Sequence, residues 1–361
     1  MFAPMRYIPW ALRFYGKVPF DLASSGIPFC SADEMRILAE RVDPASFVDR
    51  SNEEGLSSAI ATYVGRPRSE IVPALGTTHA LFLAYAAMLS PGDEILVEDP
   101  GYEPLFRVAE GLGASARTFP RREADRFAVD PEIVAARMGP KTRAIVVSNL
   151  HNPSGVRIPN DVLLDLARIA EARGAYLVVD EVYGAFDDLL DPKSARHVAD
   201  NVVTVSSLTK CYGLGMHRVG WLLGPPEIAL RAQDAALSTF IHLPSTHAAF
   251  GIAAFAQLSH FAERARAIVG EKRRVAERWI GSFPEARWSA PAAGLFGLVS
   301  LPGREDLLPS IERLAETAGV LVGAGRFFGA PHAFRLSWAS CDEGRFEEGL
   351  ARLAPLVRGE L

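Results

Sequence analysis

Short, almost continuous apolar runs recur through the middle of this chain, and they constrain its fold more than any other feature. The runs are EILVE (94–98), AIVVS (144–148), YLVVD (176–180) and VVTVS (202–206). They are rich in β-branched residues, which is typical of strands buried on both faces of a parallel sheet. Segments with helical character separate them, at 102–111, 131–138 and 160–173. This alternation predicts an α/β layered domain with a mostly parallel sheet.

The alternation of strand and helix segments stops after the last of these runs. VGWLL (219–223) follows VVTVS after only about a dozen residues, which is short for a helical crossover and favours an antiparallel strand. From residue 256 on, a charged helix over 261–279 and short strands near 295–301 and 334–339 predict a smaller α+β domain. We expect three parts: an N-terminal arm over 1–45 that joins the small domain, a large domain over 46–255 and the small C-terminal domain over 256–361.

Composition excludes several classes of protein. The chain has 361 residues and a formal charge of −5, so it lacks the basic excess of a nucleic-acid binder. Its apolar runs fall short of the roughly twenty residues that span a bilayer, so we expect no membrane partner. The three cysteines are too scattered for a disulfide framework or a zinc site, and we expect no metal. A reducing cytoplasm fits this pattern best.

A turn of small residues precedes the helix that we expect over 80–89. It contains Gly76, Thr77 and Thr78. Such a turn presents unpaired backbone N–H groups and the positive end of the helix dipole, which suit a phosphate. The same pattern also fits an ordinary threonine N-cap after a glycine turn.

Polar residues follow two of the expected strands. Asn152, in SNLHNPSG, could offer an amide into the crevice at the carboxyl ends of parallel strands, although the motif also fits a simple turn. Asp180 ends an apolar strand, where a buried carboxylate needs a cation such as a protonated heterocyclic nitrogen. The alternative is that Asp180 caps the next turn. Tyr183 follows three residues later and could donate to a neighbouring oxygen.

Cationic residues mark two further segments. Lys210, in SSLTKCYGLGMHRVG, follows a buried strand and lies near Arg218 in sequence, so a lowered pKa would let it form an imine. A solvated loop lysine is the alternative. Ser207 and Arg218 could reach one phosphate. Arg335 lies inside the apolar strand FRLSWA and needs an anion, either a ligand carboxylate or an acidic side chain of the protein.

Taken together in this order, these motifs resemble the fold-type I pyridoxal-phosphate enzymes, in particular the class I/II aminotransferases. The matching stretches span about residues 55–340 and are PGDEILVEDPGY, HNPSG, VVDEVY, SSLTK with HRVGW, and RFFG with FRLSWA. The resemblance implies a large domain with a mostly parallel mixed sheet, a smaller α+β domain and pyridoxal 5'-phosphate as cofactor.

The resemblance also implies roles for individual residues. Lys210 would form the imine with the cofactor, Asp180 would partner the pyridinium nitrogen, and Lys210, Asp180 and Tyr183 would be the catalytic residues. Gly76, Thr77, Thr78, Ser207 and Arg218 would hold the phosphate, Tyr102 would stack on the ring, and Asn152 and Tyr183 would bind its phenolic oxygen. Gly26, Asn152 and Arg335 would bind the substrate, with Arg335 on its α-carboxylate. The implied reaction moves the amino group of an α-amino acid to a keto acid.

One position departs from the family pattern. Members usually carry a tyrosine about five residues before the glycine that is Gly55 here, and that tyrosine reaches the phosphate of the neighbouring subunit. Arg50 stands near this place. We therefore expect a homodimer in which Arg50 reaches the neighbouring site. Arg50, the SSG at 24–26 and HNPSG are also similar to capreomycidine synthase, which cyclises a hydroxylated arginine, so a non-transaminating lyase or cyclase is the alternative.

Overall fold

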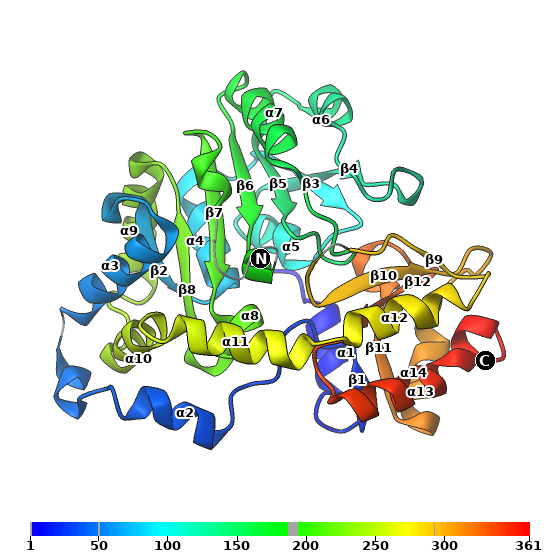
Figure 1. Cartoon of the computed structure of the whole chain (residues 1–361). Helices are drawn as coiled ribbons and strands as arrows, with labels where there is room; N and C mark the ends of the chain where they lie inside the picture. Colours follow the sequence, from blue (N-terminus) through cyan, green and yellow to red (C-terminus); the bar gives the residue numbers. More distant parts are fainter. Residues whose placement is uncertain (1, 50, 187–193, 292) are drawn as a thin grey trace.

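The computed structural model describes residues 2–49, 51–186, 194–291 and 293–361. Within them, a seven-stranded sheet has the order β2-β8-β7-β6-β5-β3-β4 (Figure 1). Its strands are β2 (Ile71–Leu75), β3 (Glu94–Asp99), β4 (Ser115–Pro120), β5 (Thr142–Ser148), β6 (Tyr176–Asp180), β7 (Val202–Ser207) and β8 (Val219–Leu223). The runs predicted as buried strands are confirmed as β3, β5, β6 and β7.

Strand direction in this sheet determines which residues meet at one edge. The pairs β3·β4, β3·β5, β5·β6 and β6·β7 are parallel. β8 is antiparallel to both β7 and β2, as the short connection before VGWLL predicts. Because only β8 is reversed, its first residues lie at the edge where the other strands end.

Helices cover both faces of the sheet. Ala144 and Val146 of β5 pack with residues of α4 and α5, whereas Ile145 and Val147 pack with residues of α6 and α7. This alternation explains the continuous apolar runs, because the side chains from Ala144 to Ser148 are buried on both faces of the strand. The helices are α1 (Tyr7–Leu12), α2 (Ala32–Ala39), α3 (Asn52–Val64), α4 (Thr77–Met88), α5 (Pro104–Gly111), α6 (Pro131–Arg137), α7 (Asn160–Glu171), α8 (Thr209–Tyr212), α9 (Pro226–Thr239), α10 (Ser245–Phe255), α11 (Leu258–Val269), α12 (Lys272–Gly281), α13 (Leu308–Ala318) and α14 (Glu343–Arg358).

A second sheet has five strands within the described residues, in the order β1-β11-β12-β10-β9. The strands are β1 (Phe20–Leu22), β9 (Arg287–Trp288), β10 (Phe296–Ser300), β11 (Val320–Ala324) and β12 (Ala333–Ser337). β1 pairs in parallel with β11, so the N-terminal segment adds a strand to this sheet. The domain boundaries after residues 45 and 255 stay a prediction.

One predicted helix is wrong in its extent. The charged segment 261–279 is not one helix, since α11 ends at Val269 and α12 begins at Lys272. Gly270 between them has φ +43°, outside the helical region, and this breaks the helix. In Figure 1, α11 runs below the large sheet from α10 toward α12 beside the small sheet.

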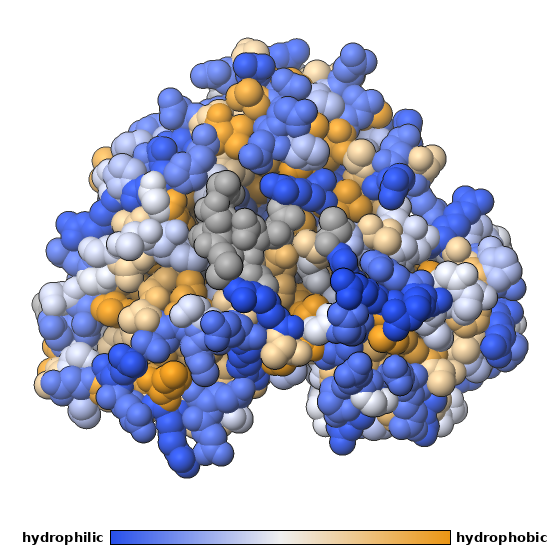
Figure 2. All heavy atoms as spheres, viewed as in Figure 1, coloured by the Kyte–Doolittle hydropathy of each residue, from blue (hydrophilic) through white to orange (hydrophobic). Residues whose placement is uncertain are grey.

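The surface drawn in Figure 2 is mostly hydrophilic, with apolar atoms in scattered patches. Within the described part of the chain, no helix combines the length and apolar character needed to cross a membrane.

Candidate active site

A cavity of about 200 Å³ lies at the edge where β5, β6 and β7 end and β8 begins. It gathers most of the residues that the sequence singled out. Its predicted lining residues are Thr77, Thr78, Tyr102, Asn152, Asp180, Tyr183, Ser207, Lys210 and Arg218. Ile8, Leu81, Pro104, Val182 and Thr209 complete the wall. Sequence reasoning missed Ile8, because nothing in the N-terminal segment signals its approach to residues more than seventy positions away.

Hydroxyl groups, backbone N–H groups and a guanidinium meet at the start of α4. Gly76, with φ +86°, is the N-cap and makes no side-chain cap, so the threonine N-cap interpretation is wrong. Thr77 Oγ1 donates to Ser207 Oγ at 2.9 Å. The Arg218 guanidinium packs so closely on Gly76 that a Cβ there would lie 2.3 Å from Nη2. These groups form one cluster of donors suited to an anion.

Arg218 carries a positive charge that no carboxylate of the described residues neutralises by an ion pair. Its Nη2 donates instead to the carbonyl of Leu75 at 3.2 Å, and its Nη1 to the carbonyl of Gly215 at 3.3 Å. Its φ of 57° is unusual for a residue with a side chain and directs the guanidinium back over Gly76. Thr78 and Arg218 are exposed in the single chain. The cluster is therefore open to an anionic ligand.

Asp180 lies at the end of β6 and is 6% exposed. Its Oδ1 accepts from the Val182 N–H at 3.0 Å, so it does cap the following turn. Burial raises the pKa of the Asp180 carboxyl to about 7, and the negative charge of Glu98 adds to this shift, while the Val182 N–H and the positive charge of Lys210 oppose it. A cation placed against its carboxylate would offset the cost of burying the charge.

Lys210 lies in the short helix α8, is partly buried and lines the cavity, so the solvated-loop interpretation is wrong. Its Nζ donates to Ser25 Oγ at 3.1 Å. Burial lowers the pKa of the Lys210 ammonium to about 8, and the positive charges of Arg335 and Arg218 add to this shift, while Asp180 opposes it. A substantial share of the amine is therefore neutral near physiological pH, as a nucleophile requires.

The N-terminal segment reaches both Lys210 and Arg335. Gly26 packs on Lys210, and a Cβ at this position would lie 3.2 Å from the lysine Cδ. The Ile27 N–H donates to the Lys210 carbonyl at 3.1 Å. Three residues earlier than Gly26, the Ala23 carbonyl accepts from Arg335 Nη2 at 2.9 Å. The segment thus joins the lysine to the arginine.

Arg335 lies in β12 and is fully buried. Its Nη1 donates to Asn152 Oδ1 at 2.7 Å, and its Nη2 donates to the Tyr7 hydroxyl at 2.7 Å. No described carboxylate lies within ion-pair distance of it, and its Nε has no hydrogen-bond partner in the described structure. The interpretation as an ion pair with an acidic side chain is therefore not met by the described residues. Tyr7 had no sequence signal, because an aromatic residue in a mixed N-terminal segment resembles ordinary packing.

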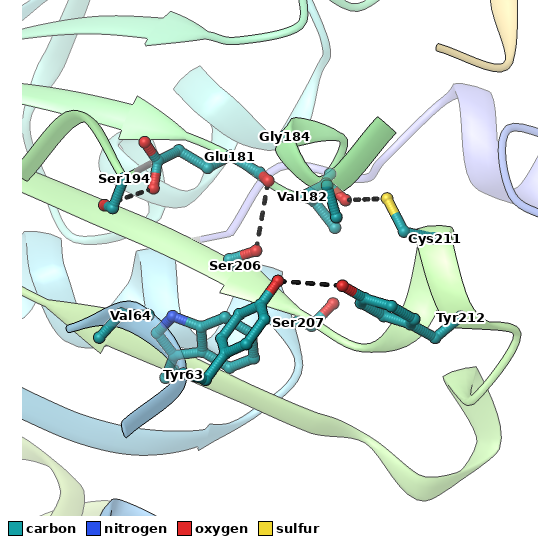
Figure 3. Close-up of a pocket in the computed structure, with 12 residues that line it drawn as sticks. Tyr63, Val64, Glu181, Val182, Gly184, Ser194, Ser206, Ser207, Cys211 and Tyr212 are labelled. Atoms are coloured by element: carbon teal, nitrogen blue, oxygen red, sulfur yellow. Dashed lines mark hydrogen bonds between the residues drawn. The ribbon is translucent and has the colours of Figure 1, made fainter. Parts of the chain in front are cut away.

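A second cavity, of about 50 Å³, lies behind Ser207 (Figure 3). Figure 3 shows the Tyr63 and Tyr212 hydroxyls hydrogen-bonded to each other, at 3.0 Å, and the Cys211 thiol donating to the Val182 carbonyl, at 3.2 Å. The thiol contact ties α8, which carries Lys210, to the loop after Asp180. The residues that line this second cavity therefore hold the wall of the first cavity in place.

Arg50 lies outside the described residues, so the structure says nothing of the predicted contact with a neighbouring site.

Comparisons with known proteins agree with this geometry. The family described as aminotransferase class I and II matches residues 36–353. Capreomycidine synthase of Streptomyces vinaceus is 31% identical, over 96% of this chain and 91% of that protein. Arginine–pyruvate transaminase AruH of Pseudomonas aeruginosa is 30% identical, over 72% of this chain and 67% of that protein. The crystal structure of a PLP-dependent aminotransferase from Streptococcus suis superposes with a TM-score of 0.88 at 24% identity, over 99% of this chain and 98% of that one, and so shows the same fold.

Proposed function

We infer the reaction of this chain from its family, because the chain belongs to the class I and II aminotransferases. Its cofactor is pyridoxal phosphate. When bound, this cofactor supplies an aldehyde that bonds to amines and a protonated ring that accepts an electron pair. We propose that the chain moves the amino group of an α-amino acid to a keto acid.

The donor cluster at α4 fits the phosphate. Arg218 provides the charge, the hydroxyls of Thr77, Thr78 and Ser207 donate hydrogen bonds, and the first N–H groups of α4 face the same space. Gly76 is required because a side chain there would collide with Arg218. These residues would hold the cofactor and fix its position.

Asp180 supplies a negative charge in the same site, opposite in sign to the positive charge of Arg218. We propose that its carboxylate holds a proton at the ring nitrogen, which gives the buried anion the cation it lacks in the protein alone. Tyr102 would stack on the ring, and Asn152 and Tyr183 would donate to its phenolic oxygen. All of them line the same cavity as Asp180.

Lys210 performs the proton transfer. With the cofactor bound, its partly neutral amine would be the group that bonds to the aldehyde. Once released by an amino substrate, Nζ would accept the proton from the substrate Cα and donate it to the former aldehyde carbon of the cofactor. Ser25 and Gly26 keep the lysine side chain in the cavity.

The observation that carries this proposal is the unpaired charge of Arg335, a fully buried guanidinium beside Asn152 with no carboxylate of the described residues in ion-pair contact. Burying such a charge without a partner is costly, and a bidentate carboxylate is its best partner. We propose that the α-carboxylate of the substrate is this partner. Among the described residues that line the cavity, the cations are Lys210 and Arg218, so we propose a substrate without a second carboxylate.

We also propose that the protein works as a homodimer, with Arg50 directed to the phosphate of the neighbouring subunit. An arginine would supply the anion contact that a tyrosine supplies in most of the family.

A cyclase or lyase reaction is the second candidate. It is favoured by the 31% identity to capreomycidine synthase over 96% of the chain. Such an enzyme would need the same contacts to the cofactor and the same arginine, so the described site fits both reactions.

One experiment separates the two. The purified protein with its cofactor is mixed with single amino acids, including arginine, in the absence of any keto acid, and the cofactor absorbance is followed. Transamination converts the cofactor to its aminated form, and a keto acid such as pyruvate reverses the change. A product that forms while the cofactor keeps its aldehyde form contradicts transamination and supports the cyclase or lyase. Arg335→Leu is the control, because it should abolish either reaction at its binding step.

A further inference from the structure

The guanidinium that should bind the substrate is closed off from the cavity. Arg335 is 0% exposed and is not one of the described residues that line the cavity. Asn152, which does line it, accepts from Nη1. Tyr7, the first residue of α1, covers another side, with its ring centroid 5.4 Å from the arginine Cζ and its hydroxyl 2.7 Å from Nη2.

The hydrogen bonds of Arg335 leave no pair of parallel N–H groups free for a carboxylate. A guanidinium has five N–H groups, two of them on Nη2. Both Nη2 hydrogens are used, one by the Tyr7 hydroxyl and one by the Ala23 carbonyl, at 2.7 and 2.9 Å. A carboxylate binds two parallel N–H groups, which are either Nε with Nη2 or Nη1 with Nη2. Either arrangement needs a hydrogen of Nη2.

The two acceptors differ in how readily they can leave. The Ala23 carbonyl belongs to the main chain directly after β1, and Asp21 Oδ1 holds this turn by accepting from the Ala23 and Ser24 N–H groups at 2.9 and 3.0 Å. Tyr7 contacts Arg335 through a side chain. Its hydroxyl also lies 3.1 Å from the Tyr15 hydroxyl, so it keeps one hydrogen bond after it leaves Arg335.

We propose that the Tyr7 hydroxyl is a stand-in for the substrate carboxylate: it occupies Nη2 of Arg335 in the free enzyme and gives up this position when an amino acid or a keto acid binds. The proposal rests on the proposed role of Arg335. Tyr7 is then a specificity residue, because only a ligand that binds the guanidinium more strongly than a neutral hydroxyl displaces it. A carboxylate meets this condition, since it adds an opposite charge and can accept two parallel hydrogen bonds from the guanidinium. A carboxamide of the same shape does not.

Calorimetric titration of the cofactor-loaded protein with pentanoate tests the stand-in without any turnover. Tyr7→Phe removes the competing hydroxyl and keeps the ring, so its Kd for pentanoate should be about three- to tenfold lower than that of the wild type. Tyr15→Phe is the matched control. It removes the hydroxyl that Tyr7 would keep as its partner after displacement and leaves the Arg335 contact, so its Kd for pentanoate should not fall below that of the wild type. Pentanamide should not bind measurably to the wild type.

The outcomes separate this inference from the proposed function. If Arg335→Leu abolishes pentanoate binding while Tyr7→Phe binds it equally or more weakly than the wild type, the stand-in is wrong and the role of Arg335 is kept. If pentanoate does not bind the wild type, or binds Arg335→Leu as well as the wild type, the role of Arg335 fails and the stand-in fails with it. Thermal unfolding checks that each variant is folded, and Tyr7→Leu repeats the test should Tyr7→Phe be unstable.

Discussion

Replacement of Gly76 by alanine should weaken cofactor binding through two separate effects. Gly76 has φ 86° and ψ 173°, a conformation that is almost confined to glycine and costs other residues about 1–3 kcal/mol. A Cβ would also lie 2.3 Å from Nη2 and 2.9 Å from Cζ of Arg218, so the guanidinium must move. The first effect lowers the stability of the protein, and the second removes a charged contact to the phosphate.

The size of the second effect follows from the contact that is lost. A hydrogen bond to a charged group contributes about 1.5–3 kcal/mol, which corresponds to a rise of roughly 10- to 150-fold in the Kd of pyridoxal phosphate. Spectrophotometric titration of the cofactor-free Gly76→Ala protein measures this Kd, and urea unfolding measures the stability.

Gly92→Ala provides a matched control. Gly92 also has a positive φ, of 89°, but a Cβ there meets nothing within 4 Å. It should also lose stability through backbone strain, and it should keep the cofactor Kd of the wild type. The reasoning is refuted if Gly76→Ala binds the cofactor within twofold of the wild type, or if both variants weaken binding equally.

Three further predictions concern charges around the site. Burial raises the pKa of Asp180 from 3.8 to about 7, so the folded cofactor-free protein binds this proton more tightly than the unfolded chain and loses stability as the pH rises between these values. Asp180→Asn should remove up to about 4 kcal/mol of this loss, measured by urea unfolding at both ends of the pH range; an unchanged dependence of the unfolding free energy on pH would contradict this. The neutral amine of Lys210 should set the rate at which added cofactor bonds covalently, so this rate should rise with a midpoint near pH 8, and Arg335→Leu should move the midpoint upward; a wild-type midpoint near pH 10.5 would show that the amine is not perturbed. Arg121 forms a fully buried ion pair with Glu98 at 2.7 Å, so Arg121→Met should cost about 3–5 kcal/mol of unfolding free energy. Arg36→Ala, which breaks the exposed pair with Asp33, should cost less than about 1 kcal/mol, and similar losses for the two variants would refute this ranking.

The sequence predicts the centre of the large sheet well, because its strands carry their own signal. β3, β5, β6 and β7 are buried on both faces and therefore read as continuous apolar runs. β2 was not predicted. It is a five-residue strand that contains Pro73, and a proline, which has no N–H, is tolerated because β2 lies at the edge of the sheet.

The residues of the site likewise fall into those that the sequence could place and those that it could not. Residues at the ends of predicted strands, such as Asp180 and Lys210, could be placed together from the sequence because parallel strands end at one edge. Contacts made by the N-terminal segment could not. Tyr7 and Arg335 are 328 positions apart, and neither residue type nor spacing indicates that one hydroxyl satisfies the other's guanidinium.

The covalent bond between Lys210 and pyridoxal phosphate is the central claim of this account. Borohydride reduction of the cofactor-saturated protein fixes such a bond, and peptide mapping by mass spectrometry locates it. We predict one pyridoxyl group per chain, on Lys210. A pyridoxyl group on another lysine, or none at all, would contradict the account.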